Sequence, residues 1–155
     1  MRQPASLSLP RVLALVGGCG LVGAFFMPWF STQNLLLSGQ FLHQFLGNPG
    51  DLRRFLPGSS GDPAEAQLLR GLVDLFPACG SLAVLAALAG GLQNRWRLPL
   101  NVVLVLSGGV PFIAWAVGIG RLPPGAAPEV GLWLIALSSA AVLVGLFLEL
   151  QVSRR

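Results

Sequence analysis

The chain has 155 residues, of which 54% are hydrophobic and 10% charged, and its mean hydropathy is +0.71. Soluble domains carry about 25% charged residues, so ten basic and six acidic side chains are too few to coat a water-facing surface. This composition excludes a soluble globular domain and, because disorder requires low hydrophobicity, a disordered chain. It indicates a single membrane domain over residues 1–155.

The net charge of +4 does not point to nucleic acid. All ten basic residues are arginines, and they are scattered between apolar blocks without the basic stripe that a nucleic-acid footprint requires. The two cysteines, Cys19 and Cys79, form neither a CxxC pair nor a metal-ligand spacing. We therefore expect no nucleic-acid partner and no metal site.

Four apolar runs predict four membrane-spanning helices. An uncharged run of about 18 residues is long enough to cross the hydrocarbon core, and the runs place the spans at about 12–30, 70–92, 98–120 and 130–149, with an outer loop over 31–69. No alternation of polar and apolar residues marks barrel strands. The predicted fold is an all-α four-helix bundle in a membrane.

The outer loop is expected to carry one amphipathic helix. After the first span closes at Pro28-Trp29-Phe30, leucines and phenylalanines recur at helical spacing over about 35–47, which predicts a short helix on the outer leaflet or over the bundle. Residues 47–50 break this helix, and a second short element is expected at 51–56. His43, the sole histidine, is the one candidate for axial ligation of a pigment or haem. A polar residue of an interfacial helix is the simpler interpretation, so no cofactor is expected.

The second span has a clear start signal. Asp62 is expected to cap the helix, Pro63 to occupy its first position and Glu65 to complete a capping box. A helix over 63–92 would be about 45 Å long, so we expect it to project beyond the bilayer or to kink at Pro77. Pro111 is expected to kink span three. The short turn over 93–99 predicts that spans two and three are antiparallel neighbours.

Small residues four apart in every span indicate close helix packing. The pairs and ladders are Gly20 with Ala24, Ala83 with Ala87 and Gly91, Ala114 with Gly118, and Ala136 with Ala140.

The placement of charge predicts the orientation. If both termini and the 93–99 turn share one side, that side carries six arginines and Glu149, a net +5, while the other side carries a net −1. The positive side should be cytoplasmic. Tryptophans favour the two interfaces, so Trp29, Trp115 and Trp133 are expected as outer anchors and Trp96 as an inner one.

Short motifs resemble those of a loose group of small bacterial four-helix membrane proteins. Phe26-Met27-Pro28-Trp29-Phe30 followed by Leu37-Ser38-Gly39 resembles their "LPW…SG" opening, and Gly131-Leu132-Trp133-Leu134 resembles their "GLWL" start of the fourth span. The resemblance implies a multi-pass protein of the bacterial cytoplasmic membrane and no activity. Claudins share the four spans and a Trp-bearing first outer loop, but their paired loop cysteines are absent here.

Few side chains offer chemistry. Asp74 is the best candidate, because ionisable groups near the membrane core often mark proton or substrate paths. Arg70 lies four residues earlier on the same helical face, so an ion pair at the headgroup boundary is the alternative. Glu149 is expected to lie near Arg154 and Arg155 at the inner interface.

Three hypotheses of function follow. The first is a non-enzymatic accessory or scaffold subunit that contacts lipids and larger transmembrane partners, or copies of itself, in a respiratory or photosynthetic complex. The second is a small transporter, or a component of one, that uses Asp74 and kinks at Pro77 and Pro111. The third is a membrane thiol oxidoreductase that uses Cys19 and Cys79, which would lie at similar depths of roughly 12 to 16 Å if the first two spans pack together.

Overall fold

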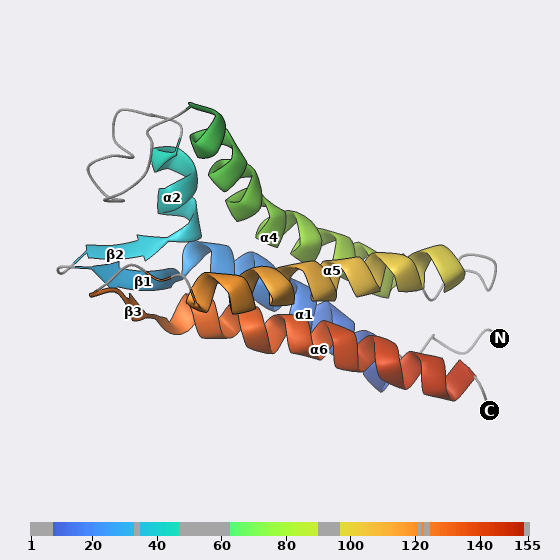
Figure 1. Ribbon diagram of the computed structural model, residues 1–155. Helices are drawn as coiled ribbons and strands as arrows, with labels where there is room; N and C mark the ends of the chain where they lie inside the picture. Colours follow the sequence, from blue (N-terminus) through green and yellow to red (C-terminus); the bar gives the residue numbers. More distant parts are fainter. Residues whose placement is uncertain are drawn as a thin grey trace.

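Four long helices form the body of the protein (Figure 1). The computed structural model describes residues 8–32, 35–46, 63–89, 97–120, 122 and 125–153. The helices are α1 (Leu9–Phe26), α4 (Pro63–Ala89), α5 (Arg97–Ile119) and α6 (Val130–Ser153), and each is long and apolar enough to cross a membrane. The four predicted spans are therefore confirmed as helices, with ends displaced by a few residues. The element expected at 51–56 and the expected Asp62 cap lie outside the described residues, as does the side chain of Glu65.

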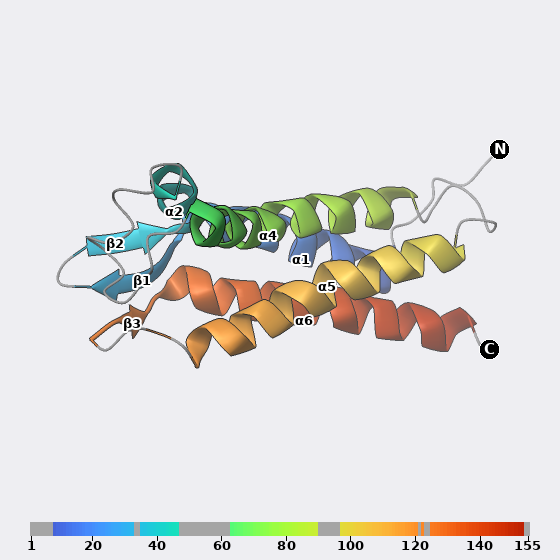
Figure 2. The same cartoon turned by 45° about the horizontal axis from the view of Figure 1, so that its top comes forward.

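The helices pack in a ring, in which α1 and α5 each contact both α4 and α6. Figure 2 shows α4 running beside α1, and α5 crossing over α6. The chain direction reverses between α4 and α5, so the predicted antiparallel pairing of these two spans is confirmed. The start of α1 and the end of α6 lie at one end of the bundle, which we call the inner end. The opposite, outer end carries three short strands and a short helix.

Consecutive glycines let α1 approach two neighbours at once. A Cβ atom on Gly17 would lie 2.6 Å from the Ser138 carbonyl oxygen of α6, and one on Gly18 would lie 2.8 Å from the Gly80 carbonyl oxygen of α4. Successive helical residues point about 100° apart because a turn holds 3.6 residues, so adjacent glycines serve different partners. Close backbone approach is the expected source of packing energy between apolar helices in lipid.

The predicted small-residue pairs take part in this packing to different extents. Ala83 and Ala87 are buried, and a Cβ atom on Gly20 would collide with the Ser138 hydroxyl. Gly118, by contrast, has no atom within 4 Å of the position of an added Cβ. Spacing alone therefore identified the small residues but not the faces that meet.

The outer end contains a small antiparallel sheet, so the all-α prediction is wrong there. Its strand order is β2-β1-β3, formed by β1 (Pro28–Thr32), β2 (Leu35–Ser38) and β3 (Ala127–Pro128). The first span ends at Phe26, four residues earlier than predicted, because Pro28 has no N–H to continue the helical ladder. The apolar run at 35–38 fits a strand as well as a helix, and pairing with β1 decides between them.

The amphipathic helix of the outer loop is present but shorter than predicted. It is α2 (Gly39–Phe45), and its first turn is capped by the Ser38 hydroxyl, which accepts a hydrogen bond from the Phe41 N–H at 3.2 Å. Serine is a preferred N-cap residue. The cap places the start of the helix at Gly39, four residues after the predicted start at 35.

Helix α4 begins at Pro63, which confirms the predicted first position. Its 27 residues correspond to a length of about 40 Å. Its N-terminal part leans away from the bundle, and α2 packs against it there (Figure 1). Pro77 lies inside this helix and Pro111 lies inside α5.

Candidate functional site

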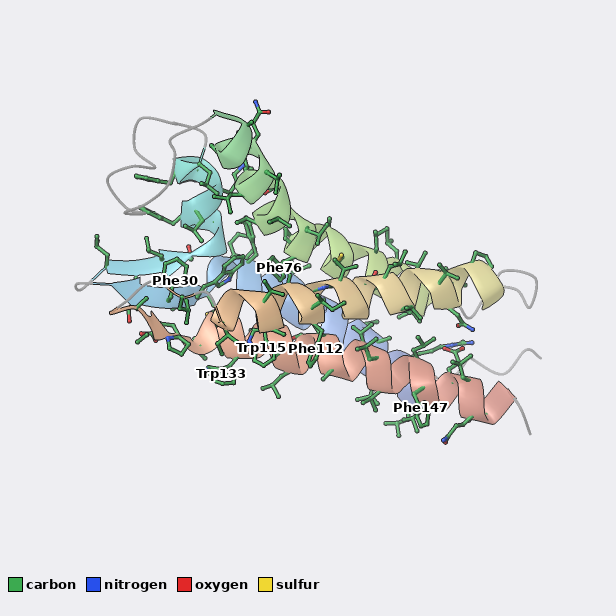
Figure 3. The ribbon with its side chains drawn as sticks, in the orientation of Figure 1. Phe30, Phe76, Phe112, Trp115, Trp133 and Phe147 are labelled. Carbon is green, nitrogen blue, oxygen red and sulfur yellow. The ribbon has the colours of Figure 1, made fainter. Side chains whose placement is uncertain are left out.

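Trp29 lies where the outer ends of α1, α4 and α6 meet. Its side chain is only 6% exposed, and its indole Nε1 donates a hydrogen bond to the Ala24 carbonyl of α1 at 2.7 Å. Its ring meets the ring of Phe76, labelled on α4 in Figure 3, edge to face with centroids 5.0 Å apart. Its carbonyl accepts a hydrogen bond from the N–H of Glu129, just before α6, at 2.8 Å. Trp29 therefore ties together three helices.

A β-bulge directs this tryptophan inward. Pro28 pairs with Ser38 and Phe30 pairs with Leu37, so Trp29 is the extra residue of β1 and opposes none in β2. Bulges re-aim a side chain and sharpen the local twist of a strand. Here the bulged residue points into the core formed by α1, α4 and α6.

Two glycines hold the tryptophan in place. A Cβ atom on Gly39 would lie 2.6 Å from Cζ2 of Trp29, and one on Gly131 would lie 2.8 Å from Cδ1 of the same ring and 2.6 Å from the Pro28 carbonyl oxygen. Only glycine leaves room at both places. The Pro-Trp, Ser-Gly and Gly-Leu-Trp motifs are far apart in the sequence but meet around the Trp29 side chain.

The tryptophans expected as interface anchors divide into two groups. Trp29 is a core residue rather than a lipid-facing anchor, because the bulge turns it inward. Trp133 is 48% exposed, whereas Trp115 is half-buried and packs against the core at the outer end. Their ring centroids lie 6.0 Å apart (Figure 3). Trp96 lies outside the described residues.

A polar cluster joins α2 to α4 at the outer end. His43 Nδ1 lies 2.5 Å from Asp74 Oδ1, and His43 Nε2 lies 3.1 Å from a terminal guanidinium nitrogen of Arg70. The sequence predicted an ion pair between Arg70 and Asp74. The structure instead inserts the imidazole ring between them, so that each charged group bonds to a different ring nitrogen.

This cluster contains both residues that the sequence singled out for chemistry outside the cysteines, His43 and Asp74. Their side chains are 32% and 46% exposed, so the cluster is open to the outer surface. One face of the imidazole ring lies near the Phe25 ring of α1, with centroids 6.5 Å apart. Each ring nitrogen of His43 therefore faces a charged side chain of α4.

The inner end has its own ionic contact. A terminal guanidinium nitrogen of Arg11 on α1 lies 3.6 Å from Glu149 Oε1 on α6. Beside this pair is a cavity of about 10 Å³, enough for one water molecule, lined also by Asn101 of α5 and alanines of α4. The partners expected for Glu149, Arg154 and Arg155, lie outside the described residues. Sequence reasoning missed Arg11, which lies 138 positions earlier in the chain.

The two cysteines have different surroundings. Cys19 is exposed on the outside of α1, whereas Cys79 is buried in α4, and both are free thiols. Neighbouring Gly18 faces α4, and the next position along the helix points about 100° away from that contact. This rotation about the helix axis explains why Cys19 faces outward.

Within the described residues, no three His, Cys, Asp or Glu side chains gather in a way that could hold a metal ion. The polar contacts instead join one element to another, at the outer end through His43 and at the inner end through Arg11. Comparison with protein families, with curated proteins and with solved structures finds no match to this chain.

Proposed function

We propose that the chain is a non-enzymatic accessory or scaffold subunit of the bacterial cytoplasmic membrane. Helices α1, α4, α5 and α6 cross the bilayer, both termini lie in the cytoplasm, and larger transmembrane partners of a respiratory or photosynthetic complex pack against the bundle. Four helices of spanning length, and the six arginines that flank the inner ends of the helices in the sequence, support this placement.

The observation that carries the proposal is an apolar surface on the outer cap, defined here as β1, β2 and α2. Leu36 is 63% exposed, and Leu35 and Phe41 are also exposed. Leucines that face outward on the helices contact lipid. The sheet extends beyond the outer ends of the helices (Figure 1), so exposed leucines on β2 favour a protein partner that covers them.

Purification in mild detergent tests the accessory role. We expect larger transmembrane proteins to co-purify in fixed proportion, and we expect Leu36→Ser with Phe41→Ser to release them. The control is Val152→Ser, which changes an exposed apolar residue at the inner end and should leave the complex intact.

Isolation of the chain always as a monomer or homo-oligomer would contradict the accessory role. That outcome would favour the transporter alternative, for which the specific observation is that Asp74 bonds to the sole histidine. In that case, proton flux in reconstituted vesicles should be lost in Asp74→Asn.

A further inference from the structure

The geometry of the polar cluster fixes the protonation of His43. A carboxylate only accepts hydrogen bonds and a guanidinium only donates them. His43 Nδ1 therefore donates to Asp74, and Nε2 accepts from Arg70. This arrangement requires a neutral ring with its proton on Nδ1, and in this state both contacts are satisfied.

Protonation of the ring affects the two contacts in opposite ways. In the imidazolium both nitrogens carry hydrogen, so an Nε2–H would face the Arg70 guanidinium, which has no acceptor and carries the same charge. The bond to Asp74 would remain and would then join two groups of opposite charge. Protonation of His43 therefore repels Arg70, while the hydrogen bond from His43 to Asp74 still joins α2 to α4.

Every described element around His43 agrees with this assignment. Helix α4 presents Arg70 and Asp74 as the charged groups, and α1 presents the uncharged ring of Phe25. The partial exposure of His43 and Asp74 gives protons from the outer water access to the ring.

We infer that His43 is a proton-binding site, and that its occupancy decides whether Arg70 is held against α2 or released to the outer surface. Proton uptake raises the charge of the three-residue cluster from zero to +1. Acidification of the outer water would therefore release the arginine. This inference does not depend on the proposed accessory role.

Nitrogen-15 NMR of the full chain in lipid nanodiscs tests the inference. His43 is the only histidine, so its two ring nitrogens are identified without further assignment. At pH 8.5 we expect a single neutral tautomer with the proton on Nδ1. Through the titration, the side-chain resonances of Arg70, identified by their absence in Arg70→Gln, should change with the same midpoint as the ring.

Charge-removing variants provide the decisive comparison. Loss of the neighbouring cation in Arg70→Gln and loss of the carboxylate in Asp74→Asn should move the titration midpoint of the ring in opposite directions, upward in the first variant and downward in the second. Arg70→Lys retains the positive charge, so its midpoint should stay closer to that of the unmodified chain. The matched control is Arg155→Gln, which removes one arginine two positions beyond the end of α6 and should leave the midpoint unchanged.

Three results would overturn the inference. These are a proton on Nε2 or a mixture of tautomers at pH 8.5, an Arg70→Gln midpoint equal to that of the unmodified chain, and Arg70 resonances that ignore the titration. Because Arg70 is exposed, Arg70→Gln should fold, and circular dichroism of each variant shows whether it does.

Discussion

Trp29 illustrates how much one side chain organises at the outer end. It receives contacts from Phe76 of α4, from Gly39 of α2 and from Gly131 of α6, and it donates a hydrogen bond back to α1. A large aromatic ring supplies extensive apolar contact, and its single N–H must find a partner when it is buried. The Ala24 carbonyl near the C-terminus of α1 provides that partner.

At this scale we predict that Gly131→Ala destabilises the fold. The added methyl would lie within 3 Å of Trp29 and of two backbone oxygens, which cannot move independently. Overpacking of this kind costs about 1–3 kcal/mol, and unfolding in mixed micelles of sodium dodecyl sulfate measures the change.

Gly118→Ala is the control for this substitution. No atom lies within 4 Å of its added methyl, and alanine is the better helix former by about 1 kcal/mol, so its free energy of unfolding should stay equal or rise slightly. Equal losses of unfolding free energy in the two variants would mean that the surroundings of Trp29 are not closely packed.

Among the elements, the boundary between β2 and α2 depends on Ser38. This residue ends the strand by pairing with Pro28 and begins the helix by accepting the Phe41 N–H. A helix of seven residues has few internal hydrogen bonds of its own. Its stability should therefore depend on its cap and on its contacts with α4 and α1.

Ser38→Ala should loosen α2 locally. Loss of an N-cap costs about 0.5–2 kcal/mol, which corresponds to faster amide exchange over residues 39–45 by a factor of roughly 2 to 30. Hydrogen–deuterium exchange with mass spectrometry measures this protection, and peptides of α6 should be unchanged.

The matched control is Ser81→Ala, which removes an exposed hydroxyl that bonds to the Pro77 carbonyl within α4. Exchange over 39–45 should not respond to it. If both serine variants accelerate exchange there equally, the cap would not be what holds the start of α2.

For the whole molecule, the two ends of the bundle differ in construction. The inner end joins α1 to α6 through Arg11 and Glu149, while the outer end combines the sheet, α2 and the His43 cluster. Six of the ten arginines flank the inner ends of the helices in the sequence, so the positive-inside tendency predicts that the outer cap faces away from the cytoplasm.

Thiol labelling measures this orientation. In a chain with Cys19→Ala and Cys79→Ala, Leu36→Cys should react with a membrane-impermeant maleimide in intact cells, because Leu36 is exposed on the cap. Val152→Cys, exposed at the inner end, should react only after permeabilisation. Reaction of both positions from the outside, or the reverse pattern, would contradict the proposed topology.

The candidate site was only partly predictable from the sequence. Asp74, Arg70 and His43 were each recognised, but the sequence suggested an ion pair within one helix, because Arg70 and Asp74 are four residues apart. His43 lies 31 positions before Asp74, and no local pattern relates the two. Their contact exists because α2 packs on the part of α4 that leans away from the bundle.

The four long helices follow from the sequence itself. A backbone in lipid must satisfy its own hydrogen bonds, and a long uncharged run can do this within itself only by forming a helix. The strands, the inward turn of Trp29 and the partner of Asp74 were decided by tertiary structure. Outside the spans, the backbone has water and other segments as alternative partners. A short apolar run such as 35–38 therefore takes its conformation from the strand beside which it lies.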